Sequence, residues 1–251
     1  MEVYWLEQTE ANVPMANDWL SPKERDLLDA MRFAKRRSDW RLGRWTAKNA
    51  LALYFLYLRL PADPQVLASI EIRSASTGAP KAYFGHQPAA ATISLSHRAG
   101  IAACAVTTPG VELGCDVEIV EPRSDAFVAD YFTTAEQSLI AQTSVADRPR
   151  LIAMLWSAKE SALKALHEGL RLDTRSVIVS PGDGVLDLHG WGATQVRYAH
   201  QRIFRGWWQH ADGLVRTVVS APPSPRPPIR LRYPNRVRDA VSFCEQRQMS
   251  A

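Results

Sequence analysis

The stretch Trp156-Ser157-Ala158-Lys159-Glu160-Ser161-Ala162-Leu163-Lys164 lies in a run whose apolar residues recur every three or four positions. This spacing predicts an amphipathic helix over residues 148–167, which Gly169 ends. Trp156, Glu160 and Lys164 follow at four-residue intervals and share one stripe of that helix, so an acid and a base lie one turn apart. Such a pair belongs either to an active site or to a solvated surface, where it stabilises the helix by roughly a few tenths of a kcal/mol.

A second pair of acids lies in residues 111–119, where apolar and polar residues alternate over nine positions. This alternation predicts a half-buried β-strand. Asp116 and Glu118 then lie on the same face, with Cβ atoms roughly 6.5 to 7 Å apart for a rise of about 3.3 Å per residue. Carboxylates this close repel each other unless a cation lies between them, and Mg²⁺ prefers such oxygen ligands. The alternative is an edge strand that exposes two acids to solvent.

The two motifs, in this order and spacing, resemble those of the Sfp-type 4′-phosphopantetheinyl transferases. That family shows a G-x-D-x-E strand followed by a W-x-x-K-E-x-x-x-K helix that ends near Gly-Leu. The matching residues here are Gly114, Asp116, Glu118, Trp156, Lys159, Glu160, Lys164 and Gly169-Leu170. Two further segments, Gly78-Ala79-Pro80-Lys81 and Ile93-Ser94-Leu95-Ser96-His97, resemble the family's G-K-P and S-x-S-H segments. The chain departs from the family pattern at Ala82, Arg98 and Cys115.

The resemblance implies an α+β fold in which two similar α/β halves are related by a pseudo-twofold axis. Each half is expected to be a small, mainly antiparallel sheet packed with a long helix. We place the halves at residues 1–108, which would bind coenzyme A, and 109–221, which would hold the metal and the catalytic residues. Residues 222–251 are a Pro/Arg-rich tail, which we expect to lie outside the core because its clustered prolines break regular structure.

Hydrophobic periodicity predicts helices from Pro22 to Leu60 and over 134–143 and 148–167. Val237 to Gln246 could also form a short helix that docks on the body. Strands are predicted near residues 66–73, 91–96, 101–108, 111–119, 175–180, 194–208 and 214–220. Pro109-Gly110 is a turn signal between two strand runs, which predicts an antiparallel hairpin. No sequence repeat is visible to match the expected pseudo-symmetry.

The resemblance also implies a reaction, the transfer of 4′-phosphopantetheine from coenzyme A to a serine of an apo acyl, peptidyl or aryl carrier protein, which releases adenosine 3′,5′-bisphosphate. Asp116, Glu118 and Glu160 would hold Mg²⁺, or Mn²⁺ in its place. Glu160 would accept the serine proton, directly or through a water molecule. Lys164 would stabilise the oxygen charge or protonate the leaving group.

The nucleotide phosphates would be bound by five residues, Arg41, Arg44, Lys81, Ser96 and His97. Arg44 follows Gly43, as in the G-R element of the family, and belongs to a basic cluster in the predicted first helix. This cluster comprises Arg32, Lys35, Arg36, Arg37, Arg41, Arg44 and Lys48. A phosphate ligand would explain the cluster, and a solvated basic helix face is the alternative.

Composition favours a soluble enzyme, because a chain of 251 residues with 46% hydrophobic content can bury a large core. No apolar run reaches the eighteen or more residues of a membrane span, and the first residues lack the pattern of a secretory signal. Cys104, Cys115 and Cys244 are too scattered for a disulfide framework. We therefore expect a cytoplasmic protein, and the resemblance to family members with two halves in one chain implies a monomer.

Two other functional classes stay open. Residues 224–251 hold six arginines against Asp239 and Glu245, and this basic tail, with eight tryptophans and a pI of about 9.1, would suit nucleic-acid binding. No helix-turn-helix, zinc-ligand spacing or RNP-like segment accompanies these features. A metal-dependent phosphohydrolase acting on a nucleotide pyrophosphate is the other alternative, since the same acids could hold Mg²⁺ for attack by water.

Overall fold

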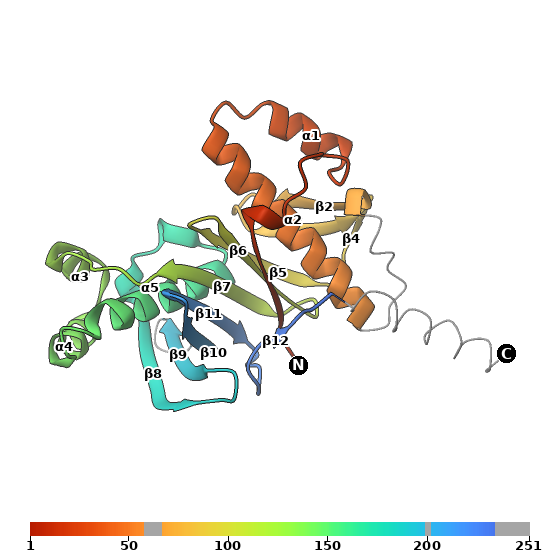
Figure 1. Ribbon diagram of the computed structural model, residues 1–251. Helices are drawn as coiled ribbons and strands as arrows, with labels where there is room; N and C mark the ends of the chain where they lie inside the picture. The colour runs from red at the N-terminus through yellow and green to blue at the C-terminus, as the bar shows by residue number, and fades with distance from the viewer. Residues whose placement is uncertain (58–66, 199–201, 234–251) are drawn as a thin grey trace.

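The protein folds into two halves, in each of which a long helix packs on a mainly antiparallel sheet (Figure 1). The computed structural model describes residues 1–57, 67–198 and 202–233. Its architecture confirms the predicted α+β class. Within the described residues, no helix combines the length and the apolar character needed to cross a membrane.

The first half packs helix α2 (Ala34–Tyr57) on a four-stranded sheet of order β12-β1-β6-β5. The strands are β12 (Ile229–Arg230), β1 (Tyr4–Thr9), β6 (Ile101–Thr107) and β5 (Thr92–Arg98). A small sheet flanks α2 and consists of strands β2 (Ile70–Ser74), β3 (Pro80–Phe84) and β4 (Gln87–Pro88). Helix α1 (Pro22–Asp29) precedes α2 in the chain. Buried Leu51 and Tyr54 of α2 share one hydrophobic core with Leu6 and Val106 of the sheet.

The second half packs helix α5 (Arg148–Ala165) on a five-stranded sheet of order β7-β11-β10-β9-β8. Its strands are β7 (Glu112–Ile119), β11 (Leu214–Ala221), β10 (Arg202–Ala211), β9 (Trp191–Tyr198) and β8 (Val177–Leu186). Two short helices, α3 (Asp125–Tyr131) and α4 (Thr134–Gln142), lead into α5. Leu155 and Ala162 of α5 share a core with Phe204 and Val215 of the sheet.

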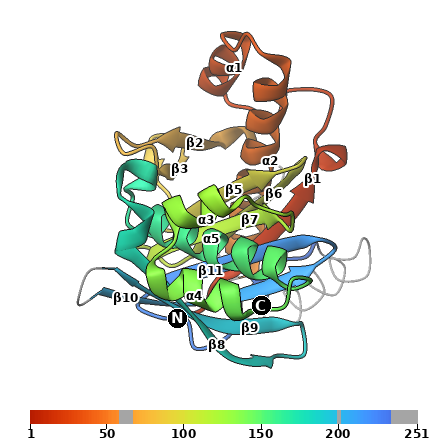
Figure 2. The ribbon, with the colours of Figure 1, turned by 90° about the vertical axis from the view of Figure 1, so that its left-hand side faces the viewer.

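The two sheets meet through a third hydrophobic core, and β5, β6 and β7 lie side by side at this junction (Figure 2). Trp5 of β1 contacts Trp191 of β9 edge to face, with ring centroids 5.4 Å apart. Arg216 of β11 is buried and donates to both carboxylate oxygens of Glu7 of β1, at 2.6 and 2.9 Å. The halves are therefore joined by apolar packing and by a bidentate ion pair.

Each half also contains a fully buried lysine that pairs with the glutamate of a helix-capping box. In the first half, Lys48 Nζ lies 2.5 Å from Glu24 Oε2 and donates to the Trp19 and Leu67 carbonyl oxygens at 2.9 and 3.2 Å. Glu24 Oε1 in turn accepts the Ile72 backbone N–H at 3.1 Å. The pair thus ties the start of α1 to the middle of α2 and to strand β2.

The second half repeats this arrangement with different residues around it. Lys159 Nζ lies 2.9 Å from Glu136 Oε2 and donates to the Thr174 and Val177 carbonyl oxygens. Glu136 Oε1 accepts the Val179 backbone N–H at 2.8 Å, which ties α4 to α5 and to strand β8. The repeated pair is the clearest sign of pseudo-twofold symmetry in the described residues. The sequence shows no repeat here, because the two arrangements share only the glutamate, the lysine and the capping residue.

Three elements differ from the sequence-based predictions. The helix predicted from Pro22 to Leu60 is two helices, because the chain turns at residues 30–33, and residues 58–60 lie outside the described part. The strand predicted over 194–208 is divided between β9 and β10, with residues 199–201 not described. The predicted hairpin at Pro109-Gly110 is wrong, since β6 pairs with β1 and β5 whereas β7 pairs with β11 in the other sheet.

Part of the tail belongs to the fold. Ile229–Arg230 pairs in parallel with β1, and Leu231 is buried. The expectation that residues 222–251 lie outside the core therefore fails for residues 229–231, because the edge of β1 offers them backbone hydrogen bonds. The short helix that Val237 to Gln246 could form lies outside the described residues.

Replacing either buried lysine by methionine is expected to destabilise the protein by about 3–5 kcal/mol, because the partner carboxylate is left buried without a counter-charge. Denaturant unfolding of Lys48→Met and Lys159→Met would measure this loss. Lys35→Met is the matched control, since the Lys35–Asp39 pair has a lysine side chain that is 84% exposed. Equal effects of all three substitutions would contradict a special role for the buried pairs.

Candidate active site

Strand β7 holds the two acids that the sequence placed on one face. Asp116 and Glu118 are both buried, 3% and 8% exposed, so the alternative of an edge strand that shows acids to solvent is excluded. The strand is not half-buried, as predicted, but buried on both faces. Cys115 and Val117 point into the core between the sheets, while the opposite face of β7 lies against α5.

Helix α5 approaches β7 so closely that one position must be glycine. A Cβ atom added at Gly114 would lie 1.7 Å from the Ser161 carbonyl oxygen of α5, far inside any allowed contact. The glycine of the G-x-D-x-E motif is therefore explained by packing. It lets the helix come close enough for its polar side chains to reach Asp116, two residues further along the same face of the strand.

Lys164 of α5 makes the direct contact between helix and strand. Its Nζ donates to Asp116 Oδ1 at 2.7 Å and to the Cys115 carbonyl oxygen at 3.1 Å. Burial lowers the pKa of Lys164, but the negative charges around it, Asp116 foremost, outweigh burial and leave the pKa raised. Glu160, one turn earlier, is half-buried, and burial together with the charge of Asp116 raises its pKa to about 7. The predicted helix stripe thus brings both residues to the acids of β7.

The acids carry oxygens that are open to a further ligand. Asp116 Oδ2 and Glu118 Oε2 are buried and have no hydrogen-bond partner in the described structure. Burial, then the neighbouring Asp116, raises the pKa of Glu118, although Arg98 and Arg123 each lie 3.6 Å from its Oε2. As the side chains stand in residues 1–57, 67–198 and 202–233, no three His, Cys, Asp or Glu groups form a ready metal-binding cluster. The open carboxylate oxygens nevertheless fit the donor set of Mg²⁺.

Trp156, the first residue of the helix stripe, covers these acids. It is buried and hydrogen-bonds to Glu118, which works against the effect of burial on the pKa of that carboxyl. Its ring also packs edge to face on Phe127 and Tyr131 of α3, with centroids 5.2 Å away in both contacts. Sequence analysis missed α3 because it is seven residues long, and periodicity is too weak a signal over so few residues.

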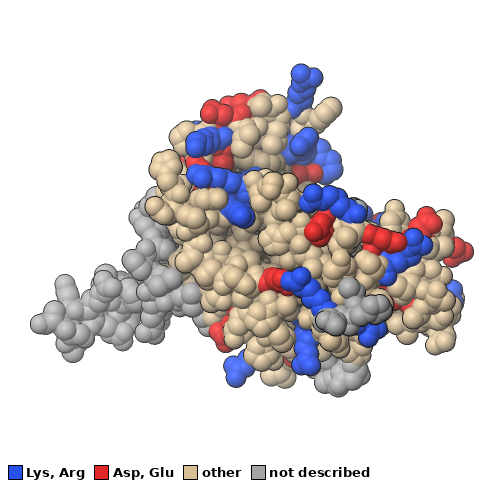
Figure 3. All heavy atoms as spheres, turned by 180° about the vertical axis from the view of Figure 1, so that it is seen from behind, with Lys and Arg blue, Asp and Glu red and all other residues tan. Residues whose placement is uncertain are grey.

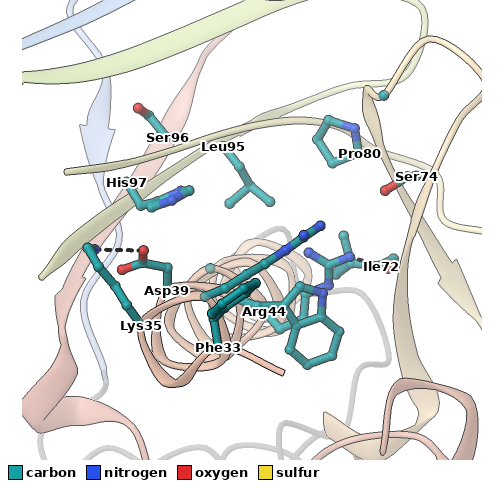
Figure 4. A pocket seen from close by; sticks show the side chains of 14 residues that line it. Phe33, Lys35, Asp39, Arg44, Ile72, Ser74, Pro80, Leu95, Ser96 and His97 are labelled. Atoms are coloured by element: carbon teal, nitrogen blue, oxygen red, sulfur yellow. Dashed lines mark hydrogen bonds and ion pairs between the residues drawn. The ribbon is translucent and has the colours of Figure 1, made fainter. Parts of the chain in front are cut away.

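A cavity of about 630 Å³ lies in the first half, between α2, the β2–β3 sheet and β5 (Figure 4). Its walls include Phe33 and Trp40 from the region of α2, and Ser96 and His97 from β5. Arg44 lies at its side, where the guanidinium stacks 4.6 Å from the Trp40 ring and donates to the Ile72 carbonyl oxygen at 3.3 Å. Figure 3 shows further Lys and Arg side chains on the surface over α1 and α2.

A second cavity of about 240 Å³ shares lining residues with the first. Gly78, Pro80 and Leu95 line both cavities, and the second one extends to Lys164 of α5. The turn around Gly78 is therefore where the two cavities meet. The pair of cavities forms one groove that begins in the first half and extends to Lys164, whose Nζ donates to Asp116.

The structure gathers some of the predicted phosphate ligands and leaves others apart. Arg44, Ser96 and His97 line the cavity, whereas Lys81 is exposed on β3 and does not. Arg41 donates to the carbonyl oxygens of Pro14 and Met15, also away from the cavity walls. Lys48, a member of the predicted basic cluster, is the buried partner of Glu24 and is not available to a phosphate.

Several residues of the site escaped the sequence analysis. Trp40 lies four residues before Arg44 on α2, so the spacing that places side chains on one helix face would have found it. Phe33 and Arg123 gave no such signal, because each lies in a connecting segment whose path depends on the tertiary structure.

Comparison with known proteins bears on the second half. Residues 112–215, which run from β7 through α5 into β11, match the family model of the 4′-phosphopantetheinyl transferase superfamily. A solved structure of Helicobacter pylori holo-[acyl-carrier-protein] synthase in complex with coenzyme A is similar to part of this chain. The match covers 42% of this chain and 98% of the synthase chain, with 18% sequence identity and a TM-score of 0.32. No match was found among curated proteins.

Gly114→Ala is expected to destabilise the protein by about 3 kcal/mol or more, because the new methyl group meets the backbone of α5 rather than a movable side chain. Gly43→Ala on α2 is the matched control, since its Cβ would meet nothing within 4 Å and alanine favours a helix by up to about 1 kcal/mol. Thermal or denaturant unfolding would compare the two, and a stable Gly114→Ala protein would refute the close approach.

Proposed function

We propose that this chain, whose residues 112–215 match the family model of the 4′-phosphopantetheinyl transferase superfamily, transfers 4′-phosphopantetheine from coenzyme A to a serine hydroxyl of an apo carrier protein. Adenosine 3′,5′-bisphosphate would be the second product. The carrier would be an acyl, peptidyl or aryl carrier protein, and the reaction would depend on Mg²⁺ or Mn²⁺.

One observation carries the proposal, the position of the Lys164–Asp116 contact at the inner end of the groove. A long ligand lying in this groove would have its nucleotide in the larger cavity and its reacting phosphate near the acids. Coenzyme A has this shape, with a charged nucleotide at one end and a pyrophosphate between nucleotide and pantetheine. The outer part of the groove is basic and aromatic, and its inner part extends to Lys164, the partner of Asp116, which suits such a molecule.

Asp116, Glu118 and Glu160 are the residues that would hold the divalent cation. The open oxygens of Asp116 and Glu118 and the raised pKa of Glu160 fit this assignment, because a cation relieves both the missing contacts and the repulsion among the acids. When bound, the cation would neutralise part of the pyrophosphate charge.

Glu160 is proposed as the base for the serine proton. Without a cation, burial and the charge of Asp116 raise the pKa of Glu160 to about 7, so this carboxylate takes up a proton more readily than an exposed one does. As the serine oxygen bonds to the phosphorus on the pantetheine side, the bond from that phosphorus to the bridging oxygen breaks, and the bridging oxygen leaves with the nucleotide. Lys164 has three N–H donors and uses two on Asp116 and Cys115, so one is left for the oxygen that gains charge.

Arg44 and His97 are proposed to face the nucleotide phosphates, since they line the cavity. Ser96 also lines it, but its hydroxyl donates to Asp116. Phe33 and Trp40 offer the purine ring an aromatic wall. Arg41 and Lys81 would contribute little to phosphate binding, because their side chains do not line the cavity. The described residues that line both cavities belong to one chain, and we propose that the protein acts as a monomer. Its buried free thiols, Cys104 and Cys115, suit the cytoplasm.

Intact-protein mass spectrometry of apo carrier proteins incubated with this chain, coenzyme A and Mg²⁺ tests the proposal. A metal-dependent gain of about 340 Da on a carrier, the mass of one phosphopantetheine, is the expected result of metal-assisted phosphoryl transfer. Cleavage of coenzyme A without any gain on a carrier would favour the phosphohydrolase instead. Glu160→Gln should lower the transfer rate at least about 100-fold while coenzyme A still binds, as loss of a general base would.

Arg44→Ala is expected to weaken coenzyme A binding about tenfold or more, because a charge-assisted hydrogen bond to phosphate is lost from the cavity wall. Titration calorimetry would measure the Kd. Arg41→Ala, which removes a guanidinium of the same helix that is held by two loop carbonyls, is the matched control and should change the Kd less. An unchanged Kd in Arg44→Ala would remove this residue from the phosphate site.

A further inference from the structure

The contact between β5 and β7 at the junction of the halves is made by side chains. Each is an edge strand of its own sheet, and no backbone pairing between them occurs in the described residues. Ser94 Oγ accepts the Cys115 backbone N–H at 3.0 Å, and Ser96 Oγ accepts the Val117 backbone N–H at 3.3 Å. The two hydroxyls therefore replace the hydrogen bonds that a neighbouring strand would give to β7.

Ser96 makes a second contact that Ser94 does not. Its hydroxyl donates to Asp116 Oδ1 at 2.7 Å, while its oxygen is held by the Val117 N–H. A serine hydroxyl has one proton, so this geometry directs that proton to the carboxylate. Lys164 donates to the same oxygen, and both donors together leave Asp116 Oδ2 free and buried.

We infer that Ser96 is a positioning residue, which fixes the carboxylate of Asp116 so that Oδ2 points to the divalent cation. This inference rests on the proposed function, and it changes the part that the family resemblance gave to Ser96, that of a phosphate ligand. Hydrogen bonds from outside the ligand shell orient metal-binding carboxylates in this way. A phosphate in the cavity could use the hydroxyl proton only after the bond to Asp116 had broken.

Ser94 is a matched control within the same strand. Both serines are buried, at 3% and 7% exposure, both point to β7, and both accept one backbone N–H. Their contacts differ in the bond to Asp116. Loss of either hydroxyl should lower the stability of the junction to a similar degree, so a difference in cation binding reports on the carboxylate alone.

The test measures Mn²⁺ binding to the full chain without coenzyme A. The electron paramagnetic resonance signal of free Mn²⁺ reports how much of the ion is unbound. Ser96→Ala is expected to raise the Mn²⁺ Kd about tenfold, the lower end of the range for residues that support metal ligands. Ser94→Ala is expected to leave the Mn²⁺ Kd within about twofold of the wild-type value, a shift smaller than loss of a supporting hydrogen bond causes. Both variants should show a similar fall in melting temperature, and coenzyme A affinity measured without metal should be unchanged in Ser96→Ala.

Three results would overturn the inference. These are an unchanged Mn²⁺ Kd in Ser96→Ala, an equal loss of Mn²⁺ affinity in both variants, or no Mn²⁺ binding by the wild-type chain. A fall in coenzyme A affinity with intact Mn²⁺ binding would return Ser96 to the phosphate site. If Ser96→Ala alone loses Mn²⁺ affinity but the wild-type chain modifies no carrier, the inference stands and the proposed transfer fails.

Discussion

A fully buried lysine requires a counter-charge, and this requirement shapes both halves of the protein. Lys48 and Lys159 have no exposed side-chain surface, and burial lowers the pKa of both while the paired glutamates act against it. Removing an ammonium group from water costs several kcal/mol unless a carboxylate and further acceptors surround it. The glutamate of a capping box and two backbone carbonyls meet this need in each half. A short helix, a long helix and a strand are thereby held in one relative position, in which the long helix cannot rotate about its axis.

The fixed rotation of α5 determines where the candidate catalytic groups lie. Glu160 follows Lys159 directly and Lys164 lies five residues after it, so a helix anchored at Lys159 holds both at the junction with β7. The first half has Asn49 and Leu53 at the same distances from Lys48. The two halves therefore share an architecture but differ in their side chains. Glu160 and Lys164 lie in the second half, and the larger cavity lies in the first.

The candidate site depends on the junction as much as on either half. Gly114 lets α5 approach β7, the serine hydroxyls of β5 hold the other edge of β7, and the groove crosses from the first half to Lys164. Arg216 and Glu7 close the opposite side of the junction with a buried bidentate pair. A substitution that loosens this junction would separate the cavity from the acids even where both remain intact.

The sequence alone determined the features that depend on local periodicity. The strand with Asp116 and Glu118 on one face and the helix stripe of Glu160 and Lys164 follow from spacings of two and four residues, which are properties of the backbone itself. Only the tertiary structure decided which charges line the candidate site and which are buried in structural ion pairs. Lys48 and Arg44 belong to one basic run in the sequence, yet one is the buried partner of Glu24 and the other lines the cavity. The pairing of β7 with β11, the entry of residues 229–231 into the first sheet and the bond from Ser96 to Asp116 likewise join segments far apart in the chain. Local spacing carries no information about such contacts, because they depend on how complete elements pack.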